Sequence, residues 1–150
     1  MANVVDFDTG IKRIYEVVQR FEKPVLVSIH SPGRNHGKST LIRRLMEELY
    51  QNGMHFTSEI YSELFSSADM EPINGHDGHF LDIGGASGPK YSKDMVNRSV
   101  LSTFGKTLDY SVFIYNPKMA LPDINRLCSV MDLVISNPDS TIKRGHDLRV

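Results

Sequence analysis

The sequence predicts an α/β protein: a three-layer sandwich in which helices cover both faces of a mostly parallel, five-stranded sheet. Short apolar runs alternate along the chain with longer segments in which apolar residues recur every three or four positions. The first pattern is typical of buried strands and the second of amphipathic helices. Strands joined through helices form parallel sheets covered on both sides. The 150 residues are enough for a single domain with its own core.

The first part of the chain predicts a leading helix within residues 1–22 and then a strand. Asp8–Gly10 supply capping residues at the start of the helix. Pro24 disfavours helical backbone at the residue before it, so the helix ends there. Val25–Ile29 then forms a short buried strand. The apolar face of the helix consists of Ile11, Ile14, Tyr15, Val18 and Phe21.

A second helix and two further strands follow. From Ser39, apolar residues at helical spacing continue until Asn52–Gly53, a typical C-terminal cap. Met54–Tyr61 has mixed polarity and is either an edge strand or the start of a helical segment through Phe65. After a turn-rich loop, His79–Ile83 is predicted to be a buried strand.

The second half of the chain repeats the alternation. A helical stripe runs from Met95 to Phe104 and is closed by Gly105. Tyr110–Tyr115 is the clearest later strand, and Pro122 and Asp123 suit the first turn of the next helix. A last short strand is expected at Leu133–Ile135. Residues 141–150 are polar and basic, and we expect them to form a flexible tail.

Composition sets limits on the partners. The chain has 17 lysines and arginines against 18 acidic residues, so no overall charge attracts nucleic acid or an anionic membrane. Cys128 is the single cysteine, and Met1–Asp6 lacks the character of a secretory signal. No apolar run approaches the roughly 18 residues of a membrane-spanning helix. We therefore expect a soluble cytoplasmic protein with small-molecule partners.

The most specific motif lies between the first strand and the second helix. Ser31–Thr40 contains Gly37-Lys38-Ser39, which fits the end of the pattern G-x-x-x-x-G-K-[ST]. In this pattern backbone amides wrap phosphates, the lysine reaches the outer phosphates and the hydroxyl binds magnesium. The helix dipole adds positive potential at the same point. The predicted nucleotide-binding residues are Gly33, Arg34, Asn35, His36, Gly37, Lys38, Ser39 and Thr40, with Lys38 also catalytic.

One position departs from the pattern. Pro32 stands where the first glycine is expected, and a glycine follows as Gly33. Proline lacks an N–H, but the donors expected to face the phosphates lie at Asn35–Thr40. The departure affects the direction in which the loop leaves the strand, and hence the reach of Lys38. The alternative interpretation is that the motif is only a turn and a helix cap.

The stretch Val25–Leu45 resembles the P-loop nucleoside triphosphatase superfamily, and within it the nucleoside and nucleotide kinases such as uridine kinases. Met131–Pro138 also looks like the final strand and turn of that kinase group, whose following loop borders the adenine. The resemblance implies a P-loop fold, with ATP or another nucleoside triphosphate and Mg²⁺ as cofactors. It also places Asn137 among the nucleotide-binding residues.

Acidic partners are expected at neighbouring strand ends. Magnesium prefers oxygen ligands, so Asp82 is predicted to hold the ion together with Ser39 and to count among the catalytic residues. Asp82–Gly85 also fits the D-x-x-G pattern of small GTPases, although such turns arise because Asp and Gly favour loops. The kinase resemblance further implies a catalytic base near Glu59 or Glu63, either of which is otherwise a solvated surface charge.

Three functions remain open from the sequence. The leading hypothesis is a small phosphotransferase that moves the terminal phosphoryl of ATP to a small acceptor. A nucleotide-hydrolysing switch is suggested by Asp82–Gly85 and by the lack of room for a long lid. A non-catalytic nucleotide-binding module is suggested by Pro32 and by the lack of firmly placed arginines. Arginines near a moving phosphoryl stabilise its charge, and the candidates are Arg98, Arg126 and Arg144.

Overall fold

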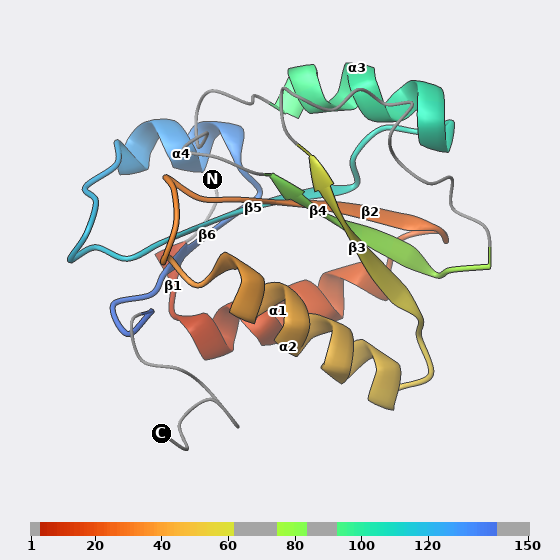
Figure 1. Ribbon diagram of the computed structural model, residues 1–150, viewed down its shortest axis with the longest axis horizontal. Coiled ribbons are helices and arrows are strands. Elements are labelled where there is room, and N and C mark those ends of the chain that lie inside the picture. The colour runs from red at the N-terminus through yellow and green to blue at the C-terminus, as the bar shows by residue number, and fades with distance from the viewer. Residues whose placement is uncertain (1–3, 62–74, 84–92, 141–150) are drawn as a thin grey trace.

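The computed structural model describes residues 4–61, 75–83 and 93–140. The elements in these ranges are, in chain order, β1 (Val4–Val5), α1 (Phe7–Val18), β2 (Val25–His30), α2 (Lys38–Gln51), β3 (Phe56–Tyr61), β4 (Gly78–Ile83), α3 (Lys93–Phe104), β5 (Tyr110–Tyr115), α4 (Ile124–Val130) and β6 (Leu133–Ser136). The described strands form one sheet in the order β1-β6-β5-β2-β4-β3, and each neighbouring pair is parallel. Helices α1 and α2 lie on one face and α3 and α4 on the other (Figure 1). The predicted α/β class with a mostly parallel sheet is confirmed.

The described part of the sheet has six strands, so the predicted number of five is wrong. The additional strand is β1, which pairs with β6 through Val4 and Val134. We expected its residues to belong to a leading helix within 1–22. A segment of two residues has no periodicity to read, and only its partner in the folded sheet defines it as a strand.

The N-terminal cap of α1 also differs from the prediction. Asp6 is the cap, and its Oδ1 accepts a hydrogen bond of 2.7 Å from the amide of Thr9. The expected capping residues Asp8–Gly10 lie in the first turn instead. Gly10 has a packing role, because a Cβ there would lie 2.5 Å from Cδ1 of Ile135 on β6. The close approach of the helix to the sheet therefore requires a glycine.

The open assignment of Met54–Tyr61 is resolved as a strand. β3 is an edge of the described sheet and pairs with β4 along its whole length, from Phe56 opposite Gly78 to Tyr61 opposite Ile83. Phe56 at the start of the strand is buried, whereas Ile60 near its end is 64% exposed, as an edge position allows. Phe65, to which the helical alternative extended, lies outside the described residues.

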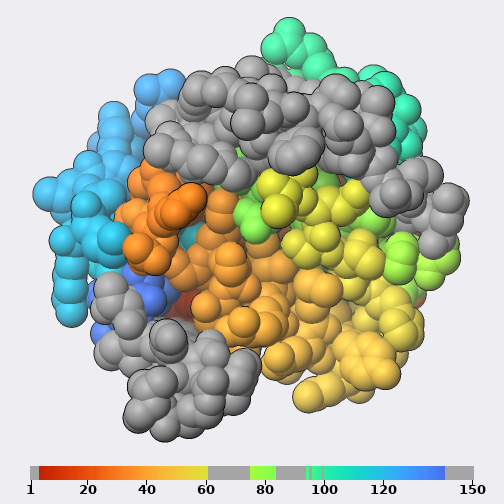
Figure 2. Space-filling view, in the orientation of Figure 1, coloured from red at the N-terminus to blue at the C-terminus, as the bar shows by residue number. Residues whose placement is uncertain are grey.

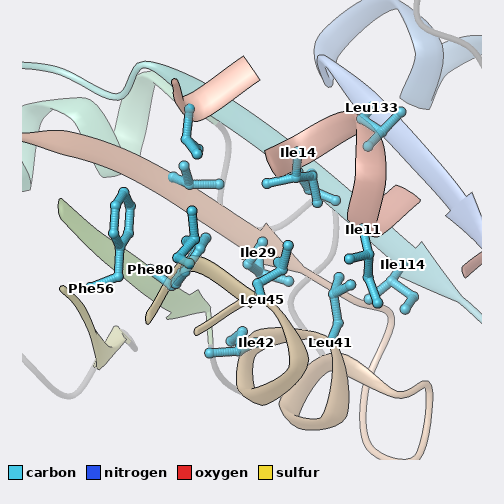
Figure 3. Close-up of a cluster of buried hydrophobic side chains, with 14 of the residues drawn as sticks. Ile11, Ile14, Ile29, Leu41, Ile42, Leu45, Phe56, Phe80, Ile114 and Leu133 are labelled. Carbon is cyan, nitrogen blue, oxygen red and sulfur yellow. The ribbon is translucent and has the colours of Figure 1, made fainter. Parts of the chain in front are cut away.

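The main core lies between the sheet and helices α1 and α2 (Figure 3). Ile14, Leu41 and Leu45 pack there against the strand residues Ile29 and Phe80, and all are fully buried. Smaller clusters pack under α3 and α4 on the opposite face. Strands buried on both sides are expected to be almost continuously apolar, as β2 and β5 are. Cys128 is buried in the α4 cluster, consistent with a small core residue.

From β2 the chain continues to β3 at one edge of the described sheet, whereas from β4 it crosses to β5 on the other side of β2. This strand pairs with β4 on one side and with β5 on the other. Helix α2 follows β2 on one face, whereas α3 follows β4 on the opposite face (Figure 1). In open parallel sheets, ligands bind outside the carboxyl ends of the strands at such a reversal. The segment after β2 and the end of β4 are therefore the place to look for a site.

Candidate functional site

The loop from Ser31 to Gly37 joins β2 to α2 and contains two residues with left-handed backbone. Asn35 has a φ of 67° and Gly37 a φ of 93°. Asparagine tolerates this region better than most residues, and glycine adopts it without steric strain. A Cβ at Gly37 would in addition collide with the side-chain amide of Asn137. Gly37 is thus required both by its own backbone and by the loop that follows β6.

Residues from the ends of β5 and β6 hold this loop in place. The backbone amide of Asn116 donates to Nδ1 of His36 at 2.8 Å, and the side chain of Asn137 donates to the carbonyl of His36 at 3.1 Å. The hydroxyl of Ser140 donates to the carbonyl of Asn35 at 2.6 Å and accepts from the side-chain amide of Asn116 at 2.8 Å. We call Asn116, Asn137 and Ser140 the loop anchors. They connect the loop to the segments that follow β5 and β6.

Helix α2 begins at Lys38 and points its N-terminus at the same loop. Its cap residue, Gly37, has no side chain with which to accept from the amides of the first turn. The first amides of a helix have no acceptor inside the helix, and the helix dipole makes this end positive. Among the residues of that turn, Ser39 is exposed and Thr40 is half-buried. This end of α2 is chemically suited to an anion such as a phosphate.

Lys38 and Asp82 are brought together at the carboxyl end of β4. The ammonium of Lys38 lies 2.7 Å from Oδ1 of Asp82 and also donates to the carbonyl of Ile83. The two side chains are 13% and 19% exposed. The pairing of β2 with β4, in which Ile29 lies opposite Asp82, brings the two segments side by side. The structure thus joins two residues that the sequence singled out independently.

Oxygen donors at this edge suit magnesium. The hydroxyl of Ser39 and the carboxylate of Asp82 are ligands that Mg²⁺ accepts. Within residues 4–61, 75–83 and 93–140, no group of three or more His, Cys, Asp and Glu side chains is arranged to hold a metal ion. Mg²⁺ commonly takes only one or two protein oxygens and completes its shell with phosphate and water. The donor set therefore fits Mg²⁺ held jointly with a phosphate ligand.

The structure separates Glu59 from this pair. Oε2 of Glu59 lies 2.6 Å from Nδ1 of His79, whose side chain is 2% exposed. Glu59 lies opposite Leu81, which packs towards α3, whereas Asp82 contacts Lys38 at the start of α2. Successive side chains of a strand point to opposite faces of the sheet. The predicted catalytic role of Glu59 therefore gains no support from geometry.

The surroundings of His79 explain what Glu59 does in the folded chain. Burial lowers the pKa of His79, although the Glu59 carboxylate acts in the opposite direction. Thr57 also contacts Nδ1 of His79 at 3.0 Å, and the ring of Phe104 lies 5.2 Å away, centroid to centroid. These contacts connect the edge strand β3 to β4 and α3. The structure gives Glu59 a place in this buried polar cluster.

The remaining predicted residues are distributed around the molecule. Arg34 is exposed on the loop between β2 and α2. Arg98 and Arg126 are exposed on α3 and α4, as expected of solvated helix residues. Glu63, Gly84, Gly85, Arg144 and the basic tail 141–150 lie outside the described residues. The glycine half of the D-x-x-G pattern is therefore without a structural account.

A buried network of hydrogen-bonded polar side chains on β2 and β5 was not predicted from the sequence. Nε2 of His30, the last residue of β2, lies 2.9 Å from the hydroxyl of Ser28, which donates to the hydroxyl of Ser111 at 2.9 Å. All three residues are fully buried. Burial and the positive charge of Lys38 lower the pKa of His30 to about 3, so its ring is neutral at pH 7. The polar residues inside otherwise apolar strands were the signal that could have revealed this network.

The neutral state of His30 predicts a loss of stability in acid. Between pH 6.5 and 3 the unfolded chain binds a proton at His30 that the folded chain does not, so the free energy of unfolding decreases as the pH falls. From pH 7 to pH 5 this site should contribute a loss of about 2 kcal/mol. Urea unfolding at the two pH values measures it. The variant His30→Gln should lose about 2 kcal/mol less than the unmodified chain over the same interval, and an equal loss would contradict the prediction.

The loop anchor Asn116 was also missed. It directly follows β5 and precedes Pro117, so it is a polar residue at the carboxyl end of a buried strand. That position is a recognisable signal, because ligands of parallel sheets bind at carboxyl ends. Its partner on the loop, His36, was predicted as a nucleotide-binding residue, and the structure uses Nδ1 of that ring to hold the loop.

Comparison with known proteins gives no assignment. No protein-family model matches the chain, and no curated protein matches its sequence. Among the helices in the described ranges, none combines the length and the apolar character needed to cross a membrane. The geometry and chemistry at the carboxyl ends of β2 and β4 are therefore the basis for a functional proposal.

Proposed function

We propose that this chain is a phosphotransferase of the P-loop type. It binds ATP or another nucleoside triphosphate with Mg²⁺ through residues 31–40 and transfers the terminal phosphoryl to a small acceptor. The observation that carries the proposal is the arrangement of Lys38 beside Asp82 at the start of a helix capped by glycine. Amides, dipole and ammonium converge there on one point, which is the chemistry that a polyphosphate requires.

Two further features support phosphate binding over a simple turn and helix cap. The loop is fixed by Asn116, Asn137 and Ser140 from two other strand ends, which a turn does not need. A loop already in its binding conformation avoids the entropic cost of ordering when the ligand arrives. The side-chain amide of Asn137 also packs against Gly37, where the phosphates would lie.

The Lys38–Asp82 pair has a direct role in the proposed reaction. A polyphosphate carries more negative charge than one carboxylate, so Lys38 turns from Asp82 to the outer phosphates when the nucleotide binds. Asp82 is then free to hold the magnesium ion or its water, together with Ser39. Bound Mg²⁺ neutralises charge on the transferred group. The residues of this chain supply position and electrostatic stabilisation rather than covalent chemistry.

The transfer itself exchanges one P–O bond for another. The bond between the terminal phosphorus and its bridging oxygen breaks, and the acceptor hydroxyl oxygen bonds to that phosphorus. The acceptor proton leaves to water or to a base, and the nucleoside diphosphate departs with the electron pair of the broken bond. Lys38 and the amides of Gly37–Thr40 stabilise the negative charge that develops on the phosphate oxygens.

The proposal is tested by calorimetric titration with ATP, ADP and GTP, with and without Mg²⁺. We expect binding that weakens when Mg²⁺ is omitted, and a weaker dependence on Mg²⁺ in the variant Asp82→Asn. Acceptor-dependent ADP release with a panel of nucleosides and nucleotides then tests the reaction. Phosphate release without an acceptor would instead support a hydrolysing switch, and binding without turnover would support a non-catalytic module. No nucleotide binding at all would contradict the proposal.

A further inference from the structure

A groove runs along the outer side of α2, between this helix and the edge strand β3. Its volume is about 510 Å³, within the range of small-molecule pockets. The face formed by α2 and β3 is turned towards the viewer in Figure 2, with α2 in orange and β3 in yellow. We call this feature the α2–β3 groove. Residues that line it include Ser39, Ile42, Met46, Tyr50, Phe56 and Ser58.

One end of the groove lies at the proposed phosphate site. Ser39, which lines the groove, follows Lys38 directly in the first turn of α2. On β3 the residues facing α2 alternate along the strand, and Ile60 lies opposite Asp82 in the strand pairing. Helix α2 runs away from this end while β3 runs towards it. Along the helix the lining therefore extends from Ser39, the neighbour of Lys38, to Tyr50, a distance of roughly 16 Å.

The polarity of the lining changes along this length. Ser39 lies at the end near the phosphate site, and Arg43 and Glu47 line the following turns of α2. The far end is aromatic: Tyr50 and His55 meet edge to face at 5.3 Å between ring centroids, and Phe56 lies beside them in the lining. Tyr50 is 66% exposed there, although an aromatic ring gains from leaving water. The groove thus offers polar groups along α2 from its Ser39 end and aromatic contacts at the far end.

We propose that the α2–β3 groove binds the body of the phosphoryl acceptor. The acceptor class that fits is an alcohol, or its phosphate ester as product, with a flat aromatic body. Its reactive oxygen lies at the Ser39 end, and its ring lies against Ile42 and Met46 in the direction of Tyr50. This inference depends on the proposed function, since it is the phosphate site that gives the groove its reactive end.

The test uses 1-naphthyl phosphate as an analogue of the product, with 1-naphthol and inorganic phosphate as its two halves. Binding is measured by calorimetry in the presence of ADP and Mg²⁺. We expect 1-naphthyl phosphate to bind at least about tenfold more tightly than inorganic phosphate, because only the ester adds ring contacts with Ile42 and Met46 to the contacts of the phosphate. The variant Ser58→Trp fills the groove from an exposed position and should remove that preference. Glu48→Trp, an exposed position on α2 that does not line the groove, is the matched control and should keep it.

Titration with ATP separates the two proposals. Ser58→Trp should leave the dissociation constant for ATP unchanged, and thermal unfolding checks that the variant is folded. If Ser58→Trp does not fold, the smaller substitution Ser58→Gln replaces it in the test. If ATP binds but 1-naphthyl phosphate shows no preference over phosphate, the groove inference is wrong and the proposed function stands. If neither ATP nor ADP binds, the proposed function itself fails. Self-association of the unmodified chain that Ser58→Trp abolishes would assign the groove to a second copy and overturn the inference.

Discussion

Replacing Lys38 with alanine should lower the rate of phosphoryl transfer by about 10²- to 10³-fold, the usual effect of removing one donor that stabilises developing charge. The ammonium lies at the start of α2, beside Asp82 and the carbonyl of Ile83. It is the side chain that can follow the charge on the outer phosphates during transfer. ATP binding should also weaken strongly, because the amides and dipole that remain attract phosphate without a full positive charge. Coupled ADP release and calorimetric titration measure both effects.

Lys106 provides a matched control. Its ammonium lies 2.9 Å from Oδ2 of Asp109 and donates to the carbonyl of Pro24 at 2.8 Å, so it has the same kinds of partner as Lys38. These partners lie at the amino end of β2, away from the loop after that strand. Lys106→Ala should change stability by an amount similar to Lys38→Ala and leave ATP binding intact. Tight ATP binding by Lys38→Ala would show that the ammonium does not face phosphate.

The second large effect is expected from Gly37→Ala. The φ of 93° at this position costs about 1–2 kcal/mol for a residue with a side chain. The added methyl group also collides with the amide of Asn137, which donates to the carbonyl of His36. We therefore expect the free energy of unfolding to fall by about 2–3 kcal/mol and ATP affinity to fall at least about tenfold. Urea unfolding and calorimetric titration measure the two quantities.

Gly53 separates backbone strain from the collision. Its φ of 82° is similar, but a Cβ there would meet no atom within 4 Å. Gly53→Ala should lose about 1 kcal/mol of stability and keep its affinity for ATP. Equal effects of the two substitutions on ATP affinity would mean that the contact between Gly37 and Asn137 does not contribute to ATP binding.

Helices and strands that are marked by several regularly spaced or consecutive apolar residues were predictable from sequence. The helix from Ser39 and the strand at Tyr110–Tyr115 were placed correctly to within one residue at their starts. The failures concern features defined by contacts with distant parts of the chain. β1 exists because β6 lies beside it, and Asp6 rather than Asp8 caps α1 because the chain turns one residue after that strand. Local sequence patterns do not contain such information.

The site shows the same division. Gly37 and Lys38 were singled out by the G-x-x-x-x-G-K-[ST] pattern, and Asp82 by its place at the end of a strand, where parallel sheets place ligands. Glu59 could not be placed, because its segment was open between strand and helix and the face of a strand residue depends on that choice. Asn116 acts through a hydrogen bond to His36, which is 80 residues away in the chain. Such a partner is visible only in the folded sheet.

The loop anchors have a consequence for how the chain acquires its site. A peptide covering Val25–Gln51 contains every residue of the phosphate motif and none of Asn116, Asn137 or Ser140. Such a peptide lacks the contacts that hold Asn35 and Gly37 in left-handed backbone. During synthesis we therefore expect the motif to adopt this backbone conformation only after β5 and β6 have emerged and joined the sheet. The phosphate binding that we propose would thus be acquired late and cooperatively, and a nascent or truncated chain would lack it.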